Sequence, residues 1–133
     1  MKRSIFALAV IGTMLFVGQL YAHHSFAATY HDDQTQKIEG TVIQFLLRNP
    51  HSFLHVEAKD EKGVMQKWTI EWGGGAQLNN QGVTKDSMKA GDHVIITGNP
   101  SRNPEDYRMR MISLTRPSDG FKWGGGRAGE VVD

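Results

Sequence analysis

Residues 37–72, KIEGTVIQFLLRNPHSFLHVEAKDEKGVMQKWTIEW, carry the pattern from which the architecture follows. Apolar and polar residues alternate through most of this stretch, and a period of two predicts β-strands. Asn49-Pro50 interrupts the alternation, because Pro cannot donate a hydrogen bond to a strand ladder. Asp60-Glu61-Lys62-Gly63 has the composition of a turn. We therefore predict three consecutive strands, at residues 37–47, 52–58 and 64–72.

The segments that follow extend this pattern into a small all-β domain. Gly73-Gly74-Gly75 ends the third strand, and residues 76–80 and 84–88 predict a short helix and a further helical turn. Strand patterns return at residues 93–98 and 107–115. Five strands with a helical insert between the third and the fourth predict a five-stranded OB-fold-like barrel. An open sandwich is the alternative, but closure into a barrel removes exposed strand edges.

The N-terminus has the composition of a cleaved export signal. Lys2 and Arg3 precede an uncharged, mainly apolar run from residue 5 to residue 20, and Leu20-Tyr21-Ala22 provides a small residue at the cleavage point. A retained membrane anchor is the alternative, but the run is shorter than the roughly 20 residues that cross a bilayer as a helix. We predict a signal peptide at residues 1–22, a mature chain beginning at His23, and a periplasmic or secreted protein.

The mature chain is expected to be one domain with an arm before it and a tail after it. We predict a polar N-terminal arm at residues 23–36, the barrel at residues 37–116 and a Gly-rich flexible tail at residues 117–133. Loss of the leader leaves 13 of the 15 basic residues against 14 acidic ones, a formal charge of −1. That balance argues against binding to nucleic acid, which needs a clustered positive field. The chain has no Cys and therefore no disulfide, and we expect a monomer that leaves the membrane after cleavage.

Several landmarks, taken in order along the chain, are shared with one family. They are His23-His24-Ser25-Phe26-Ala27-Ala28, Gly40-Thr41-Val42, Asn49-Pro50-His51, Trp68, Glu71, the run GVTKDSMKAGD at residues 82–92, and Gly98. This combination resembles the DUF6152 family of small exported bacterial proteins of unknown function. The chain departs from the family pattern at Phe53, where a Trp is usual, and at His31, near a position usually held by an acid. The resemblance implies an exported OB-like barrel and brings no established activity.

The first chemical hypothesis is copper(II) binding at the mature N-terminus. A terminal His, here His23, chelates a metal through its amine and its ring nitrogen, and imidazole suits copper. His24, His31 or a residue of the barrel would add a third nitrogen. His51 is expected to pair with a neighbouring strand residue such as Glu71, or with the arm. The predicted metal site consists of His23, His24, His51 and Glu71.

These histidines also have plainer interpretations. His23 and His24 would lie on the arm and bind metal only adventitiously, and the His51 ring would hydrogen-bond the backbone where the chain turns. His55 follows His51 at a helical spacing, but on a strand the two residues stand about 13 Å apart. That separation strains a site for a single metal ion.

A second hypothesis places a ligand on the face around Phe53, Trp68 and Trp72. OB barrels bind sugars and bases, often by stacking them on aromatic side chains. The same alternation also suits burial of Trp68 and Trp72 in the core beside Ile70. Such a barrel would bind a small ligand or a protein partner, as an accessory subunit of an exported enzyme, and would need no metal.

Catalytic motifs are missing from the sequence. It contains no Cys nucleophile, no G-x-S-x-G and no G-x-x-x-x-G-K-[ST]. We therefore expect a binding protein and not an enzyme, with copper(II) as the cofactor of the first hypothesis.

Overall fold

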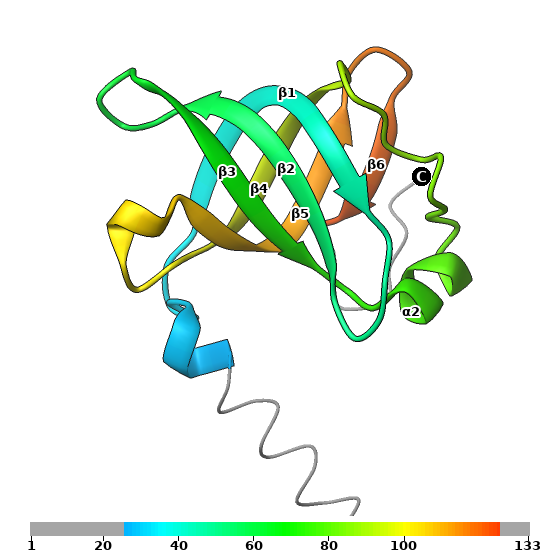
Figure 1. The fold of residues 1–133 in the computed structure, drawn as a ribbon, viewed down its shortest axis with the longest axis horizontal. Helices are drawn as coiled ribbons and strands as arrows, with labels where there is room; N and C mark the ends of the chain where they lie inside the picture. Colours follow the sequence, from blue (N-terminus) through cyan, green and yellow to red (C-terminus); the bar gives the residue numbers. More distant parts are fainter. Residues whose placement is uncertain (1–25, 126–133) are drawn as a thin grey trace, which may run out of the picture.

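The computed structural model describes residues 26–125 of the chain. Figure 1 shows a barrel of strands, with the described N-terminal segment below it and helix α2 at one end. The strands are β1 (Gln36–Leu46), β2 (Ser52–Lys59), β3 (Met65–Trp72), β4 (His93–Pro100), β5 (Arg108–Arg116) and β6 (Phe121–Gly124). The helical elements are α2 (Gly75–Asn80), a 3-10 turn (Pro104–Asp106) and one helical turn at residues 26–29.

Five of the strands close into a barrel. β1 pairs antiparallel with β2 and with β4, β2 pairs with β3, and β4 pairs with β5. A short parallel pairing of β3 with β5, between residues 69–71 and 108–110, completes the circuit. This closed order, with α2 between β3 and β4, confirms the predicted five-stranded OB-like barrel.

Alternation along the strands fills the interior. Leu54, Ile70 and Ile96, from three different strands, are all fully buried, and burial of each such side chain contributes about 1.5–3 kcal/mol. Gly40 is required where β1 crosses β2, since a Cβ there would collide with the carbonyl group of Glu57. The core therefore lies inside the barrel, and polar chemistry is confined to the outer wall and the loops.

The described part of the predicted N-terminal arm, residues 26–36, packs against the barrel. After the helical turn at residues 26–29, Tyr30 is 2% exposed and forms a β-bridge with Ser101. The Tyr30 N–H donates to the Phe26 carbonyl at 2.8 Å, and the His31 N–H donates to the Pro100 carbonyl at 3.0 Å. This segment packs against the barrel because it carries an aromatic residue that the polar composition around it conceals.

The first part of the predicted tail contains a sixth strand, β6. β6 pairs antiparallel with β5, and the Trp123 ring packs edge-on against the Trp72 ring, with centroids 5.1 Å apart. The Gly content of the segment suggested an irregular chain, but Phe121 and Trp123 alternate with polar residues and supply one apolar face. Residues 126–133 lie outside the described part of the chain.

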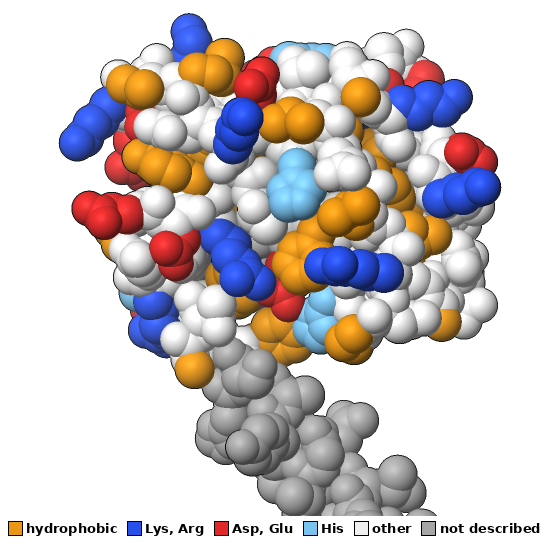
Figure 2. Space-filling model, in the orientation of Figure 1, with side chains coloured by type: hydrophobic (Ala, Val, Ile, Leu, Met, Phe, Trp, Pro, Cys, Tyr) orange, Lys and Arg blue, Asp and Glu red, His pale blue; other side chains and the backbone are white. Residues whose placement is uncertain are grey.

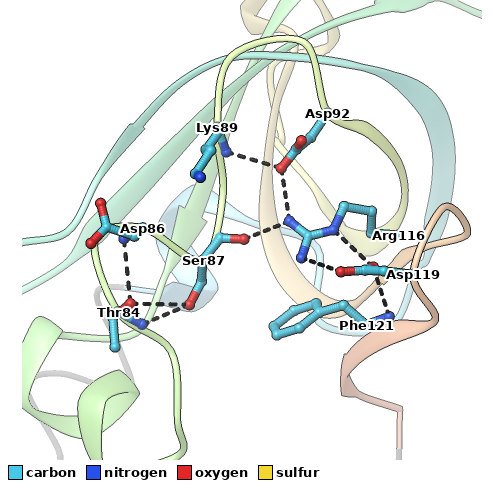
Figure 3. Close-up of polar contacts among 8 residues, drawn as sticks. All are labelled: Thr84, Asp86, Ser87, Lys89, Asp92, Arg116, Asp119 and Phe121. Carbon is cyan, nitrogen blue, oxygen red and sulfur yellow. Dashed lines mark hydrogen bonds and ion pairs between the residues drawn. The ribbon is translucent and has the colours of Figure 1, made fainter.

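Residues 84–88 form turns and not the predicted helical turn. Figure 3 shows the reason: the Thr84 N–H donates to Ser87 Oγ at 2.8 Å, and the Asp86 N–H donates to Thr84 Oγ1 at 3.3 Å. Hydroxyl groups at this spacing offer the backbone local partners that compete with helical hydrogen bonds.

Arg116 fastens these turns to the end of the barrel (Figure 3). Its Nη1 donates to the Ser87 carbonyl at 2.6 Å and to Asp92 Oδ2 at 2.7 Å, while Nε and Nη2 donate to Asp119 at 3.0 and 2.8 Å. The guanidinium also lies 5.2 Å from the centroid of the Phe121 ring. One side chain thus connects the turns after α2, the start of β4 and the β5–β6 hairpin.

Asp119 should make stability depend on acid pH. Hydrogen bonds from Arg116, followed by that from the Phe121 N–H, hold the pKa of the Asp119 carboxyl below its ordinary value of 3.8. Because the folded pKa is the lower one, the stabilisation is present above pH 3.8 and is lost as the pH falls through the folded pKa. We expect Asp119→Asn to lower the melting temperature at pH 7, and the deficit to shrink below about pH 4. Thermal melts from pH 7 to pH 2 measure the difference in melting temperature between variant and wild type. Glu57→Gln, on the exposed face of β2, is the control. A difference that does not change with pH, or one that the control equals, contradicts the prediction.

Candidate functional site

A buried carboxylate lies at the centre of the candidate site. Glu71 is on the outer wall of β3, between the inward-facing Ile70 and Trp72, yet it is only 8% exposed. Its Oε1 lies 2.6 Å from His51 Nδ1. Its Oε2 accepts hydrogen bonds from the Tyr30 hydroxyl and, at 2.9 Å, from Arg108 Nη2. Both oxygens are therefore engaged, and the charge is compensated as a buried carboxylate requires.

Three distant segments bring these partners together. Tyr30 comes from the N-terminal segment, and His51 from the loop that ends directly before β2. Arg108 is placed by the parallel pairing, in which it lies opposite Thr69, two residues before Glu71. Burial, and then the hydrogen bond to Glu71, raises the pKa of the Tyr30 hydroxyl well above its ordinary value. The hydroxyl consequently remains a proton donor to the carboxylate at any pH near neutrality.

The orientation of the His51 ring follows from its contact with Glu71. With Nδ1 facing a carboxylate at 2.6 Å, the neutral ring carries its proton on Nδ1 and leaves a lone pair on Nε2. The side chain is 35% exposed. On its other side the Phe26 ring packs against it, with centroids 5.3 Å apart, and the Arg110 guanidinium lies 4.1 Å from the Phe26 ring centroid. His51 is thus held between a buried carboxylate and the described start of the chain.

A cleft of about 270 Å³ opens beside His51 and Glu71. Its walls include Phe26, His51, Trp72, Arg110, Met111 and Trp123. Figure 2 shows the surrounding face of the molecule, where histidine, hydrophobic and basic side chains gather around a small acidic area next to the described N-terminal segment. The cleft therefore combines aromatic and apolar side chains with polar ones.

The predicted metal residues are only partly brought together. His51 and Glu71 are in contact, whereas His23 and His24 lie outside the described residues. Both oxygens of Glu71 are engaged, Oε1 by His51 and Oε2 by Tyr30 and Arg108. His31 instead approaches Gln34 and Asp33, at 3.5 and 3.9 Å. Between residues 26 and 125, no three His, Asp or Glu side chains converge closely enough to hold a metal ion.

The predicted ligand-binding residues do not share a face. Trp68 and Trp72 are 4% and 3% exposed and belong to the core. Phe53 lies on the outer wall opposite Glu71, and its ring is flanked by the guanidinium groups of Arg48 and Arg108, at 4.9 and 5.8 Å from the centroid. A platform made of all three aromatic residues is therefore absent from the described structure.

A larger groove of about 780 Å³ lies elsewhere on the barrel. It runs between the β2–β3 turn, the loop before β5 and residues 31–36, and its lining includes Asp60, Arg102 and Tyr107. Neither His51 nor Glu71 lines it. Its charges are mixed, and it contains no cluster comparable with the group around Glu71.

Sequence reasoning missed the residues that complete the site, namely Phe26, Tyr30, Arg108 and Arg110. Tyr30 carried a weak signal, as a large aromatic residue inside a polar segment. The arginines alternate with Met109 and Met111 on β5, which is typical of the outer face of any strand. Whether the two arginines reach the site depends on which strand lies beside β5. The alternation of residues along a strand does not show which strand is its neighbour.

The fold and the site together define a small OB-fold barrel whose outer wall carries a carboxylate-centred cluster under the N-terminal segment. A model of the DUF6152 family, described as a family of unknown function, matches residues 13–109, and the chain belongs to this family. The matched range contains His51, Glu71 and Arg108 and ends before Arg110 and β6. A search of curated proteins found no match. Within the described residues, no helix has the length and hydrophobicity needed to cross a membrane.

Proposed function

We propose that this chain is an exported protein that binds copper(II), using His23 at its mature N-terminus together with His51. The observation that carries the proposal is the contact between Phe26 and His51, whose ring centroids are 5.3 Å apart. Three residues of chain, from Phe26 back to His23, span at most about 10 Å. Cleavage after Ala22 would therefore release a terminal amine and an imidazole within reach of His51.

The pairing of His51 with Glu71 supports this role. Metal-ligating histidines usually donate their other ring N–H to a carboxylate or a carbonyl group, which orients the ring and raises the basicity of the ligating nitrogen. His51 has this arrangement, with Nδ1 2.6 Å from Glu71 Oε1. Tyr30 and Arg108 in turn hold the carboxylate from its other oxygen.

The proposed ligands suit copper(II). The amine and ring nitrogen of His23 form one chelate, and His51 Nε2 supplies a third nitrogen, a set that favours the tetragonal geometry of copper(II). His24 is the alternative source of that nitrogen. Because the amine and both rings must lose their protons first, affinity should fall as the pH drops below 7. The proposed role is binding and not catalysis, since the ionisable groups around Glu71 satisfy one another.

Blocking the N-terminus tests this proposal. The mature protein beginning at His23 and the same protein acetylated on its α-amine are titrated with copper(II) at pH 7.4 in competition with a chromophoric chelator. Acetylation is preferred to an added residue, which would bring a new amine. We expect the dissociation constant to rise about 100-fold or more on acetylation, because the chelate loses one arm.

Two outcomes would contradict the proposal. One is equal copper affinity of the free and acetylated proteins. The other is an exported protein whose first residue, measured by intact mass, is not His23. Both proteins should have the same melting temperature without metal, which ensures that the comparison reports binding and not folding.

A further inference from the structure

The cleft beside His51 contains a basic side chain, Arg110, that has no part in the proposed copper site. Arg110 is exposed at its mouth and forms no ion pair with an acidic side chain in the described range 26–125. Glu71 is the acidic residue of the lining, and both its oxygens are occupied. The free charge that the cleft presents is therefore positive.

Arg110 is held in place and not left to move in solvent. Its guanidinium lies 4.1 Å from the centroid of the Phe26 ring, a close cation–π contact. Its position on β5 is set by the pairing with Glu71 on β3 and with Asn99 on β4. The planar fork of an arginine fixed in this way matches the two oxygens of a carboxylate.

One part of the cleft wall is apolar, beside the polar side chains of His51, Gln77 and Arg110. Trp72, Met111 and Trp123 line it, and Trp123 Nε1 already donates to Gln81 Oε1 at 3.0 Å. Trp72 is 3% exposed, and its Nε1–H has no acceptor among the described residues. A buried donor without a partner is costly, and this one belongs to a residue that lines the cleft.

We infer that the cleft binds a small organic carboxylate, with the carboxylate on Arg110 and an apolar or aromatic body against Trp72, Trp123 and Met111. A volume of about 270 Å³ suits a molecule smaller than a typical drug. The carboxylate belongs to a free acid or to the C-terminal residue of a peptide, since both present the same group. The inference does not depend on copper, although His51 borders both sites.

The binding test uses the mature protein with its N-terminus acetylated and its metal removed on a chelating resin, so that failure of the copper proposal cannot affect it and no free carboxylate competes. The probes are phenylacetate, hexanoate and a tripeptide ending in Phe, each compared with its amide. Trp72 and Trp123 provide an intrinsic fluorescence signal, and calorimetry gives the dissociation constant. We expect saturable binding of acids and none of amides. Preference for the free acids or for the tripeptide identifies the source of the carboxylate.

Two arginine variants locate the site. Arg110→Ala should raise the dissociation constant about tenfold or more, the loss expected for a charge-assisted hydrogen bond. Arg48→Ala is the matched control, because Arg48 is also exposed and stacked on an aromatic ring, Phe53, but does not line the cleft. The inference is overturned if acids and amides bind alike, if neither binds, if inorganic phosphate binds as well as the acids, or if both variants lose affinity equally.

Discussion

Replacing Glu71 with Ala is expected to lower the free energy of unfolding by about 3 kcal/mol, the lower end of the range for breaking a buried ion pair. The lower end applies because two of the partners, the His51 ring and the Arg108 guanidinium, are 35% and 37% exposed and can be partly solvated. The Tyr30 hydroxyl, by contrast, belongs to a residue that is 2% exposed, and it would lose its acceptor. Loss of Glu71 should therefore also loosen the docking of the N-terminal segment.

Urea unfolding measures the first effect and hydrogen exchange the second. The Tyr30 N–H, which donates to the Phe26 carbonyl, should exchange faster in Glu71→Ala than in the wild type. Glu57→Ala is the matched control, since Glu57 is an exposed glutamate on the neighbouring strand. Equal stability of the two variants would show that the cluster around Glu71 does not hold the segment in place.

Replacing His51 with Ala is expected to weaken copper(II) binding at least about 100-fold. Removing a residue that only hydrogen-bonds to a metal ligand already costs about 10–100-fold in affinity, and loss of the ligand itself should cost more. The reason is geometric: a two-nitrogen chelate on a free chain end lacks the fixed third ligand that Glu71 orients. The measurement is the same chelator competition, made with the unblocked mature protein. The change leaves Glu71 Oε1 without its partner, so the melting temperature of the variant is measured alongside its copper affinity.

His55→Ala is the control for that measurement. His55 lies on the same strand, is partly exposed, and contacts Thr69 Oγ1 at 3.3 Å, away from Glu71. We expect its loss to leave copper affinity unchanged. If the two histidine variants weaken binding equally, copper is held by scattered surface imidazoles and the account of His51 fails.

The strands could be predicted because the signals for them are local. Alternation from residue 37 onward reflects strands with one face in solvent and one in the core, so the strand positions followed from it. Closure was inferred from the OB-like pattern of five strands with an insert, with an open sandwich as the alternative. β6 was missed because four residues among glycines give too short a pattern. It is ordered by the contact of Trp123 with Trp72, about fifty positions earlier in the chain.

The site could be predicted only in part, because its contacts are long-range. His51 was expected to pair with a cross-strand neighbour such as Glu71, and the register of β2 on β3, with Ser52 opposite Trp72, brings the two together. Tyr30 and Arg108 reach Glu71 across 41 and 37 residues, through the docking of the N-terminal segment and the parallel pairing of β3 with β5. Phe53 was grouped with Trp68 and Trp72 because the register of β2 on β3 was unknown; that register places Phe53 opposite Glu71, on the outer wall.

Pulsed electron paramagnetic resonance of the copper(II)-loaded mature protein tests the central claim most directly, because it counts the imidazoles bound to the metal. The spectra of the wild type, His51→Ala and His55→Ala are compared at one equivalent of copper. The account predicts two coordinated imidazoles in the wild type and in His55→Ala, and one in His51→Ala. A spectrum of His51→Ala that superimposes on that of the wild type would contradict it.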